Sequence, residues 1–162
     1  MIPWWRSTFG EAEANAARNA ILAGNISSGP ETEAFEAEIC AAVGTSYAIC
    51  VPSGTMALTL AMMALGVGPG TTVVAPAYGF VGTVNPALML GAQVQLFDDG
   101  CRGGIPASDA VEVGVSLNGF PCQPGPDIED ACQSFMAGPV TATVTCYSFA
   151  MTKLLSTGQG GA

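Results

Sequence analysis

The sequence has no histidine, and its 162 residues include only 4 basic side chains against 13 acidic ones. Without imidazole, neither a histidine metal site nor a catalytic triad with a histidine base can be built. The net charge of −9 and the scarcity of arginine and lysine also exclude a basic surface for nucleic acid or for an anionic membrane. We therefore predict no metal, no nucleic-acid partner and no membrane partner.

The sequence also lacks a hydrophobic run long enough to span a bilayer, although 49% of its residues are hydrophobic. Residues 1–6 show no basic-then-apolar signal pattern, so secretion is not expected. No Cys-x-x-Cys pair is present, and most cysteines lie in apolar runs. We interpret them as reduced thiols in a cytoplasmic protein, with a disulfide framework as the alternative. The six are Cys40, Cys50, Cys101, Cys122, Cys132 and Cys146.

Apolar runs and turn residues predict an α/β fold. Continuous apolar strands that alternate with helices are typical of a mostly parallel sheet with helices on both faces. Between residues 117 and 127 the chain is too short for a helical crossover, so part of one face is expected to be exposed or covered by another chain. The expected helices are residues 9–23, 31–43, 56–65 and 80–90, and the expected strands are residues 47–51, 71–77, 93–97, 111–117, 127–130 and 142–149.

Two features suggest a binding site for a phosphate and a nucleophile. Ser53-Gly54-Thr55 stands where a strand turns into a helix, and a helix start offers unpaired amides to an anion. An ordinary helix cap is the alternative. Lys153 is the only lysine and is flanked by apolar residues, which suits an imine-forming nucleophile. A lysine whose stem lies along an apolar surface is the alternative.

Two further side chains are candidates for holding an aromatic ring. Asp130 follows a short apolar strand, where a carboxylate would point into the ligand crevice of an α/β sheet and hold a protonated ring nitrogen. A helix N-cap is the alternative for this residue. Phe80 follows another strand and could supply a stacking face, or it could be an ordinary core aromatic.

In their order along the chain, these motifs resemble those of the DegT/DnrJ/StrS-type aminotransferases, which are fold type I enzymes that use pyridoxal phosphate (PLP). The resemblance covers nearly the whole chain but only the N-terminal half of the family. The segments that carry it are Ile2-Pro3, Gly29-Pro30, Phe35-Glu36, Ser53-Gly54-Thr55, residues 76–85, Glu129-Asp130-Ala131-Cys132-Gln133, Ser148-Phe149 and residues 153–161.

The resemblance implies a role for each candidate residue. Lys153 would bind the cofactor covalently and move the proton, and Asp130 would keep the pyridine nitrogen protonated. Phe80 would stack on the ring. Gln133 would hydrogen-bond the phenolic oxygen of the ring, and the phosphate would be held by the Ser53-Gly54-Thr55 turn and Ser148.

As a whole, the resemblance implies that residues 1–162 are the PLP-binding large domain of fold type I, incomplete at its C-terminus and without the small domain. The implied reaction moves an amino group, from glutamate, to a keto sugar nucleotide in polysaccharide biosynthesis. Lys153 favours this over the dehydratase branch, which lacks the lysine. Ser116 replaces the histidine that is usual in the family. We expect a homodimer, and the alternative function is a degenerate or truncated relative that binds PLP or a partner chain without turnover.

Overall fold

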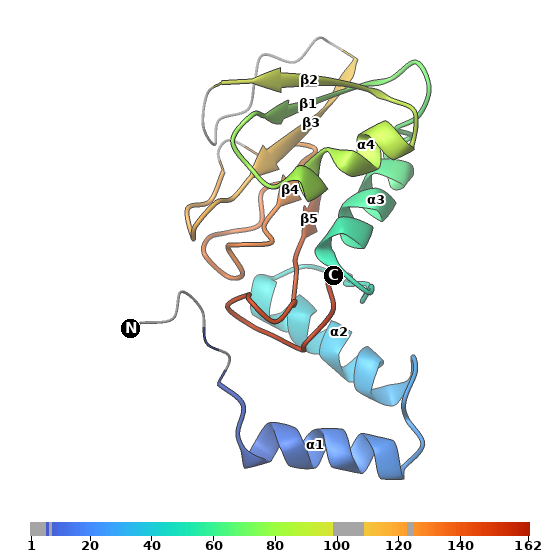
Figure 1. Ribbon diagram of the computed structural model, residues 1–162, viewed down its shortest axis with the longest axis vertical. Coiled ribbons are helices and arrows are strands. Elements are labelled where there is room, and N and C mark those ends of the chain that lie inside the picture. The colour runs from blue at the N-terminus through green and yellow to red at the C-terminus, as the bar shows by residue number, and fades with distance from the viewer. Residues whose placement is uncertain (1–5, 7, 99–108, 123–124) are drawn as a thin grey trace. The chain divides into compact units, whose positions relative to one another are not determined.

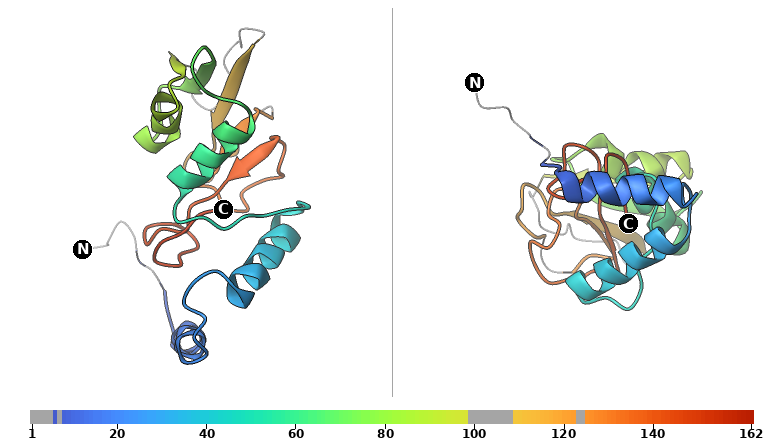
Figure 2. Two further views of the ribbon diagram at one scale, coloured as in Figure 1. Left: turned by 90° about the vertical axis from the view of Figure 1, so that its right-hand side faces the viewer. Right: turned by 90° about the horizontal axis from the view of Figure 1, so that it is seen from below.

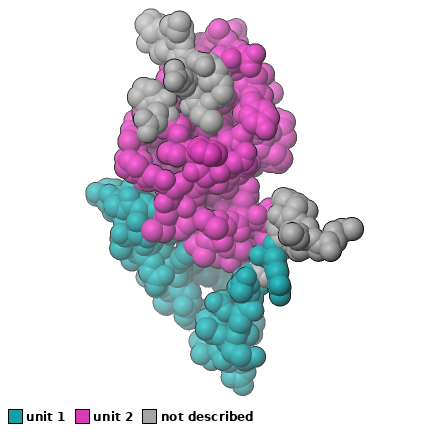
Figure 3. Space-filling view, turned by 90° about the vertical axis from the view of Figure 1, so that its left-hand side faces the viewer, with its two compact units in different colours: residues 1–50 teal, residues 51–162 magenta. Residues whose placement is uncertain are grey.

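The computed structural model describes residues 6, 8–98, 109–122 and 125–162. The chain divides into two compact units, Met1–Cys50 and Val51–Ala162 (Figure 3). Ile2-Pro3 and Cys101, which the sequence analysis used, lie outside the described residues. Of the remaining cysteines, Cys122 and Cys146 are buried. Cys40, Cys50, Cys132 and Cys146 are free thiols, as expected.

The first unit contains two helices, α1 (Glu11–Leu22) and α2 (Pro30–Val43), close to where the sequence predicts them. The Gly10 amide donates to the Glu13 carboxylate at 2.7 Å, and backbone hydrogen bonds of this kind lower the pKa of Glu13. Proline at the start of α2 and Gly44 after its end, with a φ of 77°, set the limits of that helix.

The predicted strand at residues 47–51 is wrong. Tyr47 and Ile49 are exposed at 88% and 68%, not buried. Only Val51 pairs, in an isolated bridge with Gly161. The apolar run therefore has no neighbouring strand along its length, and a strand needs such a partner for its backbone groups.

The second unit contains a five-stranded sheet in the order β2-β1-β3-β4-β5 (Figure 1). All four pairings between neighbours are parallel, which confirms the predicted α/β fold with a mostly parallel sheet. The strands are β1 (Thr72–Pro76), β2 (Gln93–Phe97), β3 (Ala110–Val115), β4 (Ile128–Asp130) and β5 (Val144–Cys146).

Two helices and a turn cover one face of this sheet: α3 (Gly54–Ala64), the 3₁₀ turn η1 (Val81–Thr83) and α4 (Asn85–Met89) (Figure 2). The sequence predicts one helix at residues 80–90, but η1 and α4 are separate. Pro86 explains the break, because proline has no amide hydrogen and its ring clashes with the carbonyl four residues earlier, that of Gly82.

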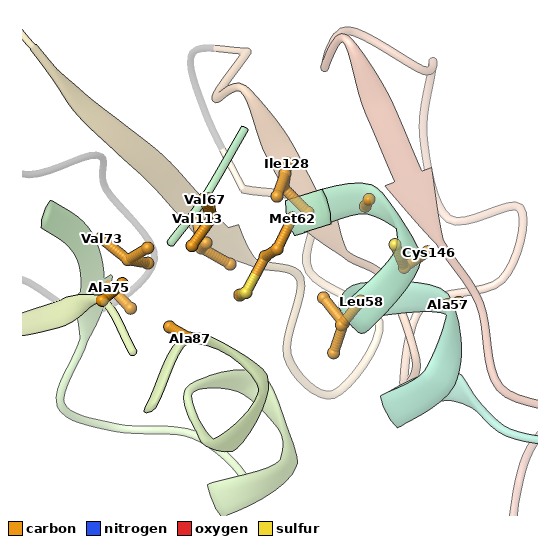
Figure 4. Packing of buried hydrophobic residues seen from close by; sticks show 12 residues of the cluster. Ala57, Leu58, Met62, Val67, Val73, Ala75, Ala87, Val113, Ile128 and Cys146 are labelled. Atoms are coloured by element: carbon orange, nitrogen blue, oxygen red, sulfur yellow. The ribbon is translucent and has the colours of Figure 1, made fainter. Parts of the chain in front are cut away.

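An apolar core fills the space between these helices and the sheet (Figure 4). Leu58 and Met62 of α3 are 1% and 0% exposed, and they meet Val113 and Ile128 of the strands. Burial of a large aliphatic side chain contributes roughly 1.5–3 kcal/mol, so α3 is held mainly by this contact. No helix in the described parts of the chain is long and apolar enough to cross a membrane.

The opposite face is covered differently. The connection from β3 to β4 contains no helix among its described residues. It packs directly on the sheet at Gly114, where a Cβ atom would lie 2.7 Å from Cys122 Sγ and 2.8 Å from Pro126 Cγ. The short crossover noticed in the sequence is therefore accommodated by a glycine that lets irregular chain replace a helix.

Candidate functional site

The strand order places the site expected from the sequence at one edge of the sheet. The chain passes from β1 to β2 on one side and then to β3 on the other, so the order reverses between β1 and β3. In open α/β sheets, ligands bind outside the carboxyl ends of the strands at such a reversal. Phe80 follows β1, Asp130 ends β4 and Ser148 follows β5, all at this edge.

The start of α3 forms one wall of the site. Ser53 is the N-cap, and its hydroxyl accepts a hydrogen bond from the Met56 amide at 3.2 Å, so the helix-cap interpretation is correct for this side chain. The first amides of a helix have no acceptor within the helix, which leaves those of Gly54 and Thr55 available to an anion. Cap and anion site are therefore compatible at this turn.

Gly54 allows two other elements to approach the start of the helix. A Cβ atom at this position would lie 2.5 Å from Cys132 Sγ and 2.8 Å from Ser148 Cβ. Ser148 also pairs with Gly161 in an isolated bridge, as Ser53 does with Gly160. The glycine-rich end of the chain thus returns to the start of α3 (Figure 1), beside Ser148.

Phe80 and Thr55 meet around Gly82. A Cβ atom on Gly82 would lie 2.8 Å from the Phe80 ring and 2.9 Å from Thr55 Oγ1. The Phe80 side chain is 66% exposed, so the core-aromatic interpretation is wrong. The structure therefore provides an aromatic ring at the surface next to the helix start, as a stacking role requires.

Asp130 is buried on the helix-covered side, at 5% exposure. Its Oδ2 accepts a hydrogen bond from Thr83 Oγ1 at 2.6 Å, and its Oδ1 accepts one from the Cys132 amide at 3.1 Å. The helix-cap alternative is wrong for this residue, because turns and not a helix follow it. Sequence reasoning missed Thr83, because no local pattern indicates that its hydroxyl meets a carboxylate 47 positions further along the chain.

The partly buried Cys132 thiol lies next to Asp130, which accepts from the Cys132 amide. Burial raises the pKa of the Cys132 thiol far above its usual range, the negative charge of Asp130 adds to this, and the positive charge of Lys153 opposes it. Both charges therefore act on the same sulfur atom. The thiol remains protonated and is not a nucleophile.

Lys153 lies in the turn that follows β5, where its amide donates to the Ala150 carbonyl at 2.9 Å. Its side chain is half-buried. The apolar neighbours in sequence do not enclose it, because Met151 and Leu154 are exposed at 50% and 86%.

Gln133 stands apart from the other candidates. Its side chain is exposed, and no hydrogen bond links it to the site among the described residues. Ser116, which the resemblance contrasts with a histidine near the cofactor, belongs to the opposite face of the sheet. Its hydroxyl donates to Glu129 Oε1 and accepts from the Cys122 amide at 2.8 Å.

Comparison with known proteins gives a consistent result. Residues 7–115, more than half of the chain, match the DegT/DnrJ/EryC1/StrS aminotransferase family. The structure is similar to that of Spr1654 from Streptococcus pneumoniae, described as a sugar aminotransferase, with a TM-score of 0.89 and 22% identity over 99% of this chain and 51% of that one.

Two other solved structures are similar. 3-Amino-5-hydroxybenzoic acid synthase gives a TM-score of 0.83 with 26% identity over 99% of this chain and 49% of that one. The dehydratase ColD, solved as an H188N variant with bound GDP-perosamine, gives 0.86 with 22% identity over 98% and 50%. The chain therefore spans about half the length of the structures that it matches.

Proposed function

Because the chain belongs to the DegT/DnrJ/EryC1/StrS aminotransferase family, we propose that it binds pyridoxal phosphate and serves in the transfer of an amino group from glutamate to a keto sugar nucleotide. We assign residues 1–162 to the cofactor-binding large domain. The observation that carries the proposal is that the start of α3 lies against Cys132, whose amide donates to Asp130, and against Ser148.

The start of α3 fits the phosphate group of this cofactor. The amides of Gly54 and Thr55 and the hydroxyls of Thr55 and Ser148 would hold it, while the Ser53 hydroxyl is engaged as the cap. Lys153 is the sole basic side chain in the described part of the second unit. Amides, hydroxyls and the helix dipole would therefore bind this phosphate without an arginine from the described part of that unit.

The neighbouring side chains fit the ring. The exposed Phe80 ring would stack against it, and Asp130 would accept a hydrogen bond from the protonated ring nitrogen. Gln133, whose side chain is exposed, would turn inward to reach the phenolic oxygen. When bound, pyridoxal phosphate supplies an electron sink for the carbon that loses its proton.

Lys153 would anchor the cofactor through its amine and then act as the general acid and base. In a chain without histidine, a lysine amine is a base that can take a proton from the substrate carbon and return it to a second carbon. The fold itself is shared with a dehydratase, so the similarity of structure leaves the reaction type open. Lys153 is the residue that favours amino transfer.

We also propose that the chain associates with a second copy. Met56, Leu60 and Met63 lie on one side of α3 and are exposed at 43%, 42% and 56%. These positions share a helix face, and a stripe of this kind is typical of a contact with another chain. Light scattering at micromolar concentration should give the mass of a dimer, and a stable monomer would contradict this part of the proposal.

The cofactor assignment is tested by borohydride reduction followed by peptide mass spectrometry. After incubation with pyridoxal phosphate, the reduced protein should carry a phosphopyridoxyl group on Lys153. The Lys153→Ala variant is the matched control and should carry none. An unmodified wild-type protein that is folded by circular dichroism would reject the proposal. Modified protein that does not transfer amino groups would support the alternative of a relative that binds the cofactor without turnover.

A further inference from the structure

Thr83 has a buried hydroxyl to which the proposed function assigns no role. It ends the 3₁₀ turn η1 (Val81–Thr83), and its side chain is 3% exposed. Its amide donates to the Phe80 carbonyl at 2.9 Å, and its Oγ1 donates to Asp130 Oδ2 at 2.6 Å. The bond joins residues 47 positions apart in the chain, so it ties the turn after β1 to the end of β4.

This hydrogen bond determines how the Asp130 carboxylate is oriented. Oδ2 is held by Thr83, and Oδ1 is held by the Cys132 amide at 3.1 Å. Two donors on two different oxygens fix both the position and the plane of the group. Each carboxylate oxygen has two lone-pair sites, so acceptor capacity remains for one further donor from the site.

The same turn also positions the stacking ring. Phe80 and Thr83 are the ends of one hydrogen-bonded turn, and Gly82 between them lies against Thr55. A movement of this turn would therefore shift the ring face and the carboxylate together. Phe80, expected to stack on the ring plane, and Asp130, expected to bind the ring nitrogen, are therefore both held in place by this turn.

We propose that Thr83 is a positioning residue for the cofactor ring, because its hydroxyl orients Asp130 toward the ring nitrogen and links it to Phe80. This inference rests on the proposed function. Thr83 acts through Asp130 and need not touch the cofactor. Its contribution should therefore depend on the presence of the ring nitrogen, which a purely structural contribution would not.

The test compares the binding of pyridoxal phosphate with that of 1-deazapyridoxal phosphate, in which carbon replaces the ring nitrogen. We expect Thr83→Val to weaken the binding of pyridoxal phosphate by about tenfold, the equivalent of one hydrogen bond to a charged group. The deaza analogue should bind the wild-type and variant proteins almost equally. Thr83→Ser, which keeps the hydroxyl, should restore discrimination between the two cofactors.

Thr71→Val is the matched control. Thr71 also hydrogen-bonds through its hydroxyl, to the Gly68 carbonyl at 2.7 Å, but it precedes β1, away from the carboxyl edge. Equal weakening of both cofactors by Thr83→Val, or no weakening of either, would overturn the inference while borohydride trapping on Lys153 still supports the proposed function. A folded wild-type protein without trapped cofactor would overturn both.

Discussion

Two neighbouring carboxylates on β4 face opposite sides of the sheet and show how different those sides are. Asp130 lies on the helix-covered side and is hydrogen-bonded by Thr83. Glu129 lies on the side covered by irregular chain and is hydrogen-bonded by Ser116 and Thr145. Both are buried, at 5% and 7% exposure, and each has hydroxyl partners.

The two carboxylates differ in their surroundings. Asp130 lies at the carboxyl end of β4, where its Oδ1 accepts a hydrogen bond from the Cys132 amide. Glu129 has neighbours that are polar but fixed, and its charge helps to raise the pKa of Tyr147 to about 12, although burial is the larger cause. A buried carboxylate is a candidate for chemistry when a ligand can reach it. Without such access, its hydrogen bonds only link neighbouring strands.

The largest effect is therefore expected from Asp130→Asn. The asparagine carbonyl oxygen can still accept from Thr83, but the loss of charge leaves the ring nitrogen without its stabilising partner. Turnover should fall on the order of a hundredfold, while cofactor affinity falls less because the phosphate contacts remain. Steady-state kinetics with glutamate and a keto sugar nucleotide measure the first quantity, and fluorescence titration measures the second. Equal turnover in both proteins would reject this role for Asp130.

The sequence was sufficient for the parallel strands and for α3, but not for the break between η1 and α4. Local patterns that tertiary contacts do not alter predict the parallel strands, the cap at Ser53 and the position of Asp130 at a strand end. The strand at residues 47–51 failed because its apolar residues are not paired, and pairing is a property of the whole sheet.

Long-range hydrogen bonds could not be predicted from the sequence for a related reason. Thr83 and Asp130 are far apart in the chain, and nothing in either local pattern indicates that they meet. The same holds for Ser116. It stands at a position that is usually a histidine near the cofactor in the family, and this did not indicate its hydrogen bond to Glu129. Alternation along a strand fixes which face a side chain takes only once the strand limits are known.

The second prediction concerns the apolar side, where α3 is anchored by Leu58. Leu58→Ala should lower the free energy of unfolding by about 3 kcal/mol, because a fully buried side chain leaves a cavity between the helix and the sheet. Met89→Ala, at an 82% exposed position at the end of α4 and outside the proposed contact between copies, is the control and should change it by less than about 0.5 kcal/mol. Urea unfolding at low protein concentration compares them. Similar losses in both variants would show that α3 does not pack on the sheet through Leu58.

The smallest effect is expected on the other side, from Glu129→Gln. Glutamine keeps one acceptor oxygen for Ser116. In the wild type the Thr145 hydroxyl donates to Glu129, and in the variant it can instead accept from the glutamine amide group. The free energy of unfolding should fall by about 1 kcal/mol, and turnover should change little because this carboxylate faces away from Lys153 and the start of α3.

A double-mutant cycle of Ser116→Ala with Glu129→Ala, which unlike Glu129→Gln removes the acceptor oxygen, isolates the hydrogen bond between these two residues. If Glu129 and Ser116 act together, the double variant should be less destabilised than the sum of the single variants by about 1 kcal/mol. Ser116→Ala also removes the acceptor of the Cys122 amide, and this part of its cost should persist in both backgrounds. Additive losses would mean that Glu129 is satisfied without Ser116. A loss of turnover in Glu129→Gln as large as that in Asp130→Asn would show that the two faces of the sheet are not functionally distinct.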